Sequence, residues 1–205
     1  AAFLKDRTTA VADTAVLYFD VNKLTAAQAF PYGMSVKQKL VYKTGNLVYA
    51  NTLRTAVVEA GAVNGAETVQ TVPSSVRFDK PVVLSWPYTP NAGVDTDKLT
   101  AWYLATDGSV ENAGGRFNDT AGLFQTLVNH FSHHTISTTS VGFGDAVNYW
   151  ATGLIHRLTS MGILTGANGN VRPDATVTRS EFAKMVVMAR KLSIEQETTR
   201  FKDIK

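Results

Sequence analysis

Short apolar runs dominate residues 1 to about 135. These runs are rich in Val, Leu, Thr and Tyr, and clusters of Gly, Asn, Asp and Pro separate them. The clearest runs lie at 15–19, 39–42, 81–86, 99–104 and 123–128. Residues 53–60 also fit a helical stripe, so their assignment stays open. Several short strands separated by turn signals are typical of a β-sandwich, and we predict an all-β sandwich for residues 1–138.

The hydrophobic pattern changes to a helical period near residue 140, after the small and polar stretch 136–140. We therefore place a domain boundary there and predict a small α-helical unit at 139–197. Its first helix is expected to end at Gly162, a residue suited to a left-handed C-terminal cap. The apolar stripe of this helix comprises Trp150, Ala151, Leu154, Ile155, Leu158 and Met161.

A second helix is predicted after the turn-rich connection 163–174, in which Pro173 prevents a continuous helix. Thr178 and Glu181 have the spacing of a capping box, so the helix should begin there. We expect it to bury an apolar stripe. The stripe comprises Phe182, Met185, Val186, Ala189 and Leu192.

Arg179 is an unusual residue for the first turn of a helix, where the macrodipole disfavours a cation by up to about 1 kcal/mol. An anionic group should compensate it. One interpretation is a salt bridge to Glu181, Asp174 or Asp145. The other is an acidic ligand bound between Arg179 and the helix N-terminus.

Five motifs of the second unit, in their order and spacing, resemble the S-layer homology (SLH) repeat. They are Phe-Gly-Asp at 143–145, Tyr-Trp-Ala at 149–151, Gly-Ile-Leu-Thr-Gly at 162–166, Val-Arg-Pro-Asp at 171–174 and Thr-Arg-Ser-Glu-Phe at 178–182. Residues 198–205 resemble the start of a second repeat. The resemblance implies an extracellular protein on the cell wall or S-layer of a Gram-positive bacterium, with further repeats in the full-length protein.

The SLH resemblance also implies a partner, secondary cell-wall polysaccharide, which is often pyruvylated and is bound noncovalently. The family's sugar-pocket positions fall on Asp145, Trp150, Gly166 and Arg179 of this chain. An aromatic face stacks on a sugar, an Arg pairs with the ketal carboxylate, and a Gly lets the backbone approach closely. Trp150 could equally be a core residue.

A second motif, His130-Phe131-Ser132, follows the predicted strand 123–128. Together with segments 80–88 and 97–103, it resembles the β-sandwiches that precede SLH repeats and, more distantly, ZU5-type domains. Some ZU5-type proteins cleave themselves between Phe and Ser. The resemblance implies that Ser132 attacks the Phe131 carbonyl, with His130 as base, and that water hydrolyses the resulting ester. Ordinary packing and turn roles for the three residues are the alternative.

The composition of the chain limits which other partners and sites it can have. The 205 residues are enough for one or two cores, and a net charge of +3 on scattered Lys and Arg does not favour nucleic acid as a partner. The chain has no Cys, and its three clustered histidines lack a matching ligand nearby, so we expect no metal site and no cofactor. No apolar run is long enough for a membrane span, and the start of the chain has no signal-peptide layout, as expected of a fragment.

Two functions from different classes follow. The first is a wall-binding module in which the SLH repeat is the anchor and the sandwich is a spacer. The alternative is a self-processing protein, in which the sandwich is a single-turnover autoprotease and not a turnover enzyme. A third hypothesis, glycan binding by the sandwich, requires Trp86, Trp102 or Tyr103 to be exposed.

Overall fold

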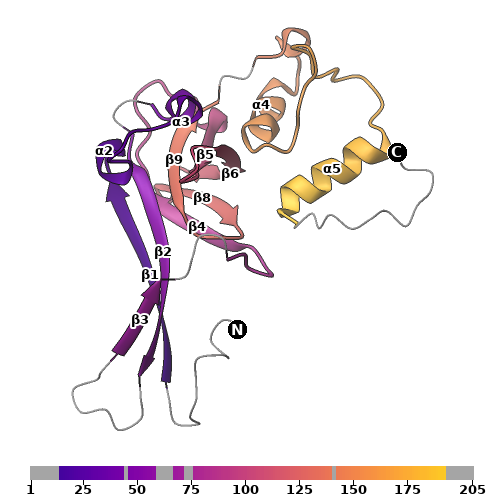
Figure 1. Cartoon of the computed structure of the whole chain (residues 1–205). Helices are drawn as coiled ribbons and strands as arrows, with labels where there is room; N and C mark the ends of the chain where they lie inside the picture. Colours follow the sequence, from indigo (N-terminus) through magenta and orange to yellow (C-terminus); the bar gives the residue numbers. More distant parts are fainter. Residues whose placement is uncertain (1–13, 44–45, 59–66, 72–75, 140–141, 193–205) are drawn as a thin grey trace.

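Two antiparallel sheets and a helical unit make up the described part of the chain in the computed structural model, which comprises residues 14–43, 46–58, 67–71, 76–139 and 142–192 (Figure 1). The first sheet has the strand order β1-β2-β9-β5-β6, with β3 paired to β2, and the second has the order β4-β8-β7. The strands are β1 (Thr14–Leu24), β2 (Val48–Val58), β3 (Glu67–Thr71), β4 (Val82–Pro87), β5 (Leu99–Leu104), β6 (Val110–Gly114), β7 (Arg116–Asn118), β8 (Leu123–Val128) and β9 (His133–Thr138). The predicted start of a second repeat at 198–205 lies outside the described residues.

The two sheets bury an aromatic core between them. In β4, Leu84 and Trp86 are buried while their neighbours are exposed, the alternation expected of a strand with one face on a core. Trp86 stacks on Tyr49 of β2 and on Phe124 of β8, with ring centroids 5.1 and 6.5 Å apart. The predicted β-sandwich is confirmed. Because Trp86 is fully buried, the hypothesis that its ring binds a glycan is wrong.

β5 and β8 coincide with the predicted runs 99–104 and 123–128. The prediction of a strand at 39–42 is wrong, because α3 (Val36–Val41) occupies this segment. The Ser35 side chain accepts a hydrogen bond from the Gln38 N–H (3.1 Å), and the Gln38 side chain accepts one from the Ser35 N–H (2.9 Å). This capping box begins a helix where the apolar pattern alone favoured a strand.

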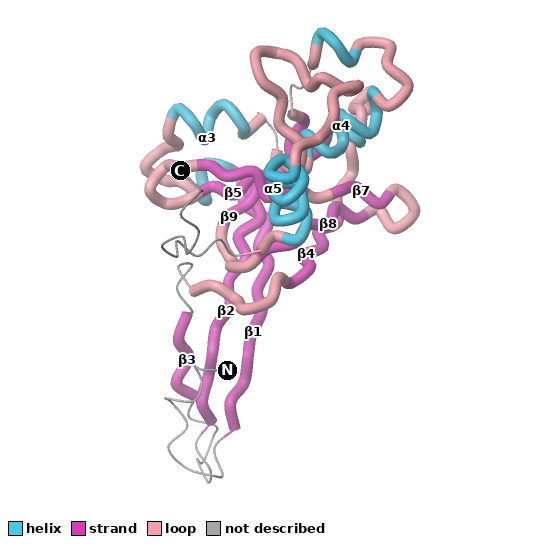
Figure 2. Tube along the Cα trace, turned by 90° about the vertical axis from the view of Figure 1, so that its right-hand side faces the viewer, coloured by secondary structure: helices cyan, strands magenta, loops and turns pink. Residues whose placement is uncertain are grey.

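The helical interpretation of 53–60 is also wrong for its described part, since β2 continues to Val58. β1 and β2 pair along eleven residues, from Thr14 opposite Val58 to Leu24 opposite Val48. Both strands and β3 extend as a ribbon beyond the remaining strands (Figures 1 and 2). Two short helices lie on the connections at the opposite end, α3 and α2 (Ala26–Ala29).

A buried polar network ties the two sheets together. The indole N–H of Trp86 in β4 donates to the Asn51 side-chain oxygen in β2 (3.0 Å). The Asn51 amide donates in turn to the Ser132 carbonyl (3.0 Å) and lies 3.3 Å from Nδ1 of His134. Because a buried polar group left without a partner costs about 1–3 kcal/mol, this network favours one relative placement of the sheets.

The second unit contains η2 (Gly144–Ala146), α4 (Thr152–Ser160) and α5 (Arg179–Arg190). At the end of α4, Gly162 has a φ of 72° and its N–H donates to Thr159, while the Ile163 N–H donates to Leu158. This is the Schellman arrangement, and it confirms the predicted helix end. The capping box of Thr178 and Glu181 at the start of α5 is likewise present.

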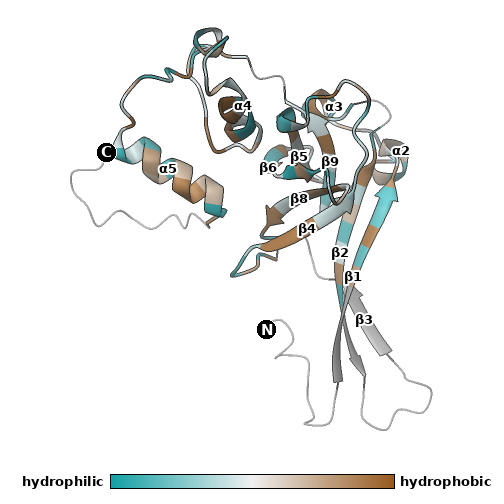
Figure 3. Ribbon diagram, turned by 180° about the vertical axis from the view of Figure 1, so that it is seen from behind, coloured by the Kyte–Doolittle hydropathy of each residue, from teal (hydrophilic) through white to brown (hydrophobic). Residues whose placement is uncertain are grey.

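The apolar stripes of α4 and α5 are more exposed than the sequence predicts. Only Ile155 among the predicted α4 residues is buried, and no residue of α5 is. Phe182 is 62% exposed, and hydrophobic residues run along α5 (Figure 3). The prediction of buried stripes is therefore wrong within the described residues. Their spacing specifies a face for packing, but Phe182, Val186 and Leu192 of that face stay exposed among the described residues.

Asn112 joins the sandwich to the helical unit. It lies at a register shift between β5 and β6, where Ala101 pairs with Gly114 and Trp102 with Asn112, so that Ala113 is an extra, bulged residue. The Asn112 side-chain oxygen accepts from Thr100 and from the Gly114 N–H. Its amide donates to the Ser160 carbonyl at the end of α4 (3.0 Å). This one side chain is therefore hydrogen-bonded to both units.

The buried network predicts a pH dependence of stability. Burial lowers the pKa of His134 to about 3 from the ordinary 6.5. The unfolded chain therefore binds more protons between these values, and the free energy of unfolding falls as the pH falls, by up to about 1.4 kcal/mol per unit from this residue. Burial lowers the pKa of His130 and His133 in the same direction. Urea unfolding at pH 7 and pH 5 should show lower stability at pH 5, with a smaller difference in His134→Gln. An equal difference in both proteins would contradict this account.

Candidate functional site

A small apolar core supports the loops of the helical unit. Phe143, Ala146 and Ile155 are buried, and Tyr149, Leu164 and Val171 pack partly buried against them. The connection between α4 and α5 folds back across this core, and Ala167 and Asn170 close a turn through two backbone hydrogen bonds (2.8 and 3.0 Å). The charged residues of the unit are held on this framework.

Asp145, one of the four predicted sugar-pocket residues, acts as a clamp on the loop. Its carboxylate accepts hydrogen bonds from the backbone N–H groups of Val171 (3.0 Å) and Arg172 (2.6 Å). These bonds hold the pKa of Asp145 below its usual range. Arg172 has a φ of 53°, a region that costs a non-glycine residue roughly 1 kcal/mol or more, and the bond to Asp145 helps to hold it there.

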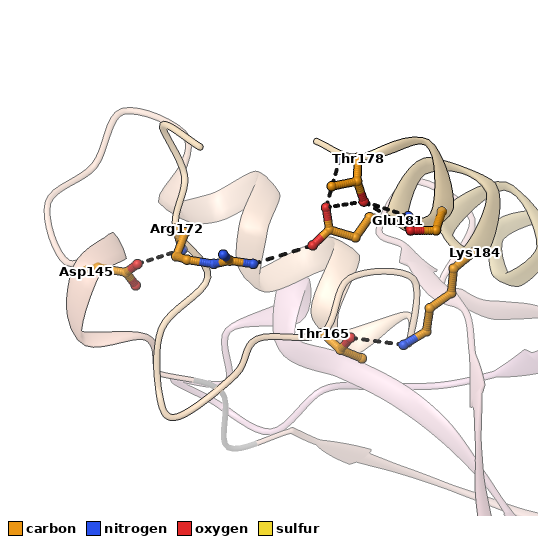
Figure 4. A network of polar contacts seen from close by, with 7 residues as sticks. Asp145, Thr165, Arg172, Thr178, Glu181 and Lys184 are labelled. Carbon is orange, nitrogen blue, oxygen red and sulfur yellow. Dashed lines mark hydrogen bonds and ion pairs between the residues drawn. The ribbon is translucent and has the colours of Figure 1, made fainter. Parts of the chain in front are cut away.

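From this clamp a chain of polar contacts leads to α5 (Figure 4). The Arg172 guanidinium lies 3.4 Å from the Glu181 carboxylate, which also accepts from the Thr178 N–H (2.9 Å) and hydroxyl (2.7 Å). These contacts lower the pKa of Glu181, with the Thr178 backbone the largest cause. One turn further along α5, Lys184 donates to the Thr165 hydroxyl (3.3 Å). The loop and α5 are thus joined by two separate polar contacts, Arg172 with Glu181 and Lys184 with Thr165.

A cavity of about 300 Å³ opens between the loop and α5. Gly166, Arg172, Glu181 and Lys184 line it, together with apolar residues that include Leu164 and Met185. Gly166 is the predicted sugar-pocket residue found in this lining. Sequence analysis missed Arg172 and Lys184. Both residues could have been considered from the sequence, since Arg172 lies in the recognised Val-Arg-Pro-Asp motif and Lys184 lies one turn after the capping box.

The remaining two predicted residues lie outside this lining. Trp150 is 83% exposed, which rules out the core role considered for it in this structure. Its ring lies 5.8 Å from that of Tyr149, whose hydroxyl donates to Asp174 (2.7 Å). Trp150 therefore offers an aromatic face to solvent, as stacking on a sugar requires.

Arg179 is exposed and makes no ion pair or hydrogen bond within the described part of the chain. The predicted partners are engaged elsewhere, because Glu181 pairs with Arg172, Asp174 with Tyr149, and Asp145 with the loop backbone. The interpretation of a salt bridge from Arg179 to Glu181, Asp174 or Asp145 is therefore wrong. Its charge at the N-terminus of α5 remains available for an anion.

The His-Phe-Ser motif lies in the short connection from β8 to β9, where the chain passes from one sheet to the other. His130 and Ser132 are buried, 5% and 8% exposed. Phe131 packs between the rings of Phe19 (4.7 Å) and Phe78 (4.8 Å). Nδ1 of His130 has no hydrogen-bond partner, and the Ser132 carbonyl is held by Asn51. The structure thus buries the motif that a self-cleavage reaction would use.

Within the described ranges, no group of three or more His, Asp or Glu side chains is placed to hold a metal ion. None of the helices described is long and apolar enough to cross a membrane.

Gly166 gives a test of the loop geometry. A Cβ at this position would run into the Phe143 ring and would lie 2.6 Å from the Asn170 carbonyl oxygen. Gly166→Ala should therefore lower the free energy of unfolding by about 1–3 kcal/mol in urea denaturation. Gly153→Ala is the matched control, because nothing lies within 4 Å of its added Cβ and the helix position favours Ala by up to about 1 kcal/mol. Equal effects of the two substitutions would contradict the close packing.

Comparisons of the sequence with known proteins give a family match in this second unit. Residues 142–183 match the family model of the S-layer homology domain. The chain is 26% identical over 140 residues to an amylopullulanase of Thermoanaerobacterium thermosulfurigenes, an alignment that covers 67% of this chain and 7% of the amylopullulanase. The chain thus spans a small fraction of the length of this relative. No solved structure matches the chain significantly.

The ZU5-like assignment of the sandwich and the roles of His130, Phe131 and Ser132 stay predictions. The family match lies within the predicted helical unit, on the segment that carries Asp145, Trp150, Gly166 and Arg179. It supports the SLH prediction for this segment, since residues 142–183 are similar to the S-layer homology domain.

Proposed function

We propose that this chain attaches a surface protein to cell-wall polysaccharide, noncovalently, through residues 142–183. The observation that carries the proposal is the match of these residues to the S-layer homology domain. The similarity to an amylopullulanase covers 7% of that enzyme, so its activity is not part of the proposal for this chain. The localisation that follows is extracellular, on the cell wall.

The preferred wall polymer in this proposal is acidic, with a pyruvate ketal as the charged group. Arg179 at the N-terminus of α5 is an exposed cation with no partner among the described residues, and Arg172 and Lys184 line the cavity between the loop and α5. Trp150 supplies an exposed aromatic face on the same unit. Arginine pairs with a carboxylate through two parallel hydrogen bonds, and an aromatic ring stacks on the apolar face of a sugar.

In the same proposal the sandwich is the spacer between the wall and the rest of the surface protein. The hydrogen bond from Asn112 to Ser160 and the ion pair of Arg157 with Asp97 (3.8 Å) hold the SLH domain against the sandwich. Further SLH repeats after residue 197 would present additional wall-binding surfaces.

Arg179 tests the role of the cation. In a wall-pelleting assay with the full repeat array, Arg179→Ala should weaken binding roughly tenfold or more, since a charge-assisted hydrogen bond contributes about 1.5–3 kcal/mol. Arg116→Ala is the matched control, an exposed cation on the edge strand β7 of the sandwich. The proposed contact would be refuted if both variants pelleted like the parent.

Self-cleavage at Phe131-Ser132 is a second candidate function. The topology around the bond favours this candidate. Strand β9 follows the bond in the chain and pairs with β2 and β5, which both precede the bond. The two halves would therefore stay associated after cleavage, held by main-chain hydrogen bonds and by the hydrogen bond from Asn51 to the Ser132 carbonyl. In this candidate the Ser132 hydroxyl forms an ester with Phe131, the peptide nitrogen takes up a proton, and water then hydrolyses the ester.

Intact mass under denaturing conditions tests the second candidate. Self-cleavage predicts two fragments that join at Phe131 and Ser132, and one intact chain in Ser132→Ala. The candidate is abandoned if the parent remains a single species of 22.2 kDa over several days.

A further inference from the structure

β1 is the outermost strand of the first sheet and has a long unpaired edge. Its eleven residues, Thr14–Leu24, pair with β2 on one side, and no strand within the described ranges pairs with β1 on the other side. Figure 2 shows β3, β2 and β1 side by side, with β1 at one side of the ribbon. About half of the backbone N–H and C=O groups of β1 therefore point away from β2, along an edge about 36 Å long.

The sequence of β1 has few of the features that prevent edge strands from pairing. It contains no Pro and no Gly, and β1 pairs with β2 without a register shift. Its charged residues are Asp20 and Lys23, and the Asp20 carboxylate already pairs with Arg54 of β2 (2.6 Å). Natural proteins protect such edges with charges, Pro, bulges or a covering segment, so an unprotected edge of this length indicates a partner strand.

An aromatic cluster lies at the midpoint of β1. Phe19 is the central residue of the strand and is 47% exposed. Its ring contacts that of Phe131 (4.7 Å), which in turn contacts the ring of Phe78 (4.8 Å). The exposed part of the Phe19 ring is therefore available to a side chain of a neighbouring strand.

We infer that β1 pairs antiparallel with β1 of a second copy of this chain, with the two-fold axis at Phe19. Two-fold symmetry requires that one residue of the strand lie opposite itself. With Phe19 at this position, all eleven residues have a partner, which gives about ten main-chain hydrogen bonds, as many as a typical protein interface contains. An axis at Asp20 would instead place two carboxylates directly opposite each other.

A second copy fits this edge better than an unordered peptide does. Its β1 is already held extended by β2, so the backbone loses little further conformational entropy on pairing. With the axis at Phe19, Asp20 is opposite Tyr18 and Lys23 is opposite Ala15, so no like charges are opposite each other. The two Phe19 residues are then cross-strand neighbours, the arrangement in which aromatic side chains stabilise a sheet.

The inference goes beyond wall attachment and does not depend on it, because β1 lies outside residues 142–183. Arg179→Ala should therefore dimerise like the parent chain, and failure of wall binding and failure of dimerisation are separate results. A dimer would carry residues 142–183 twice, and two attachment points strengthen binding to a polymer that can reach both.

Sedimentation equilibrium of the 205-residue chain is the first test. At about 100 μM protein the parent should have twice the 22.2 kDa mass of one chain. Phe19→Lys should raise the dissociation constant of the dimer about tenfold or more, because it removes the aromatic pair and places two cations opposite each other. Val36→Lys is the matched control, since Val36 is 78% exposed on α3, and it should stay within about twofold of the parent.

Single cysteines test the register, because the chain has no Cys of its own. In Phe19→Cys the two Cα atoms would lie about 4.5–5.5 Å apart, within the range of a disulfide, so mild oxidation should give a covalent dimer. Val21→Cys is the control on the same strand, at a residue that is 42% exposed. Its two Cα atoms would lie about 14 Å apart, which is too far for a disulfide.

Three results would overturn the inference. One is a parent chain that stays monomeric at about 100 μM, which would leave the edge to a strand from another part of the surface protein. The second is equal weakening of the dimer by Phe19→Lys and Val36→Lys, and the third is equal cross-linking of Phe19→Cys and Val21→Cys. The thermal midpoint of Phe19→Lys distinguishes loss of pairing from loss of folding, and the cysteine variants test the register without an introduced charge.

Discussion

The side chain of Asn112 is the constraint on which the joining of the two units depends. The bulge between β5 and β6 positions the side-chain amide of this residue. The amide oxygen accepts hydrogen bonds from Thr100 and Gly114, and the amide nitrogen donates to the Ser160 carbonyl. The end of α4 is thereby fixed on the sandwich, and a Cβ at Gly114 would lie 2.8 Å from the Met161 carbonyl oxygen. Close backbone contact and one shared amide hold the SLH domain at a defined position. Lys191, directly after α5, donates to the backbone carbonyl of the same Asn112 (3.3 Å).

Local signals were enough to predict much of the fold. The apolar runs of β5 and β8, the capping box of Thr178 and Glu181, and the left-handed Gly162 each depend on a few neighbouring residues. Where two local signals competed, the sequence was ambiguous. Residues 39–42 have strand-like composition, but the pairing of Ser35 with Gln38 starts a helix that the Gln38 amide then holds to the Ala105 carbonyl (2.6 Å).

The candidate site was predictable only in part, because the partners of a side chain often come from residues that are distant in the sequence. The SLH motifs identified the correct unit, yet nothing in their spacing showed that Asp145 would be held by the loop backbone or that Arg172 would pair with Glu181. Burial of the α5 stripe was mispredicted for a related reason: periodicity defines an apolar face but not what covers it. The sequence proposed Trp150 and Arg179 for a ligand but left a core role and a salt bridge open, and only the structure shows that Trp150 is exposed and that Arg179 has no partner among the described residues.

The central claim is that residues 142–183 bind a wall polysaccharide and not the peptidoglycan beneath it. The most direct measurement is the binding isotherm of the full repeat array on isolated Gram-positive walls, before and after chemical extraction of the secondary polysaccharide. The account predicts saturable binding to intact walls and loss of that binding after extraction. The extracted polymer, added free in solution, should compete with intact walls for the protein. Equal binding to intact and extracted walls would contradict it.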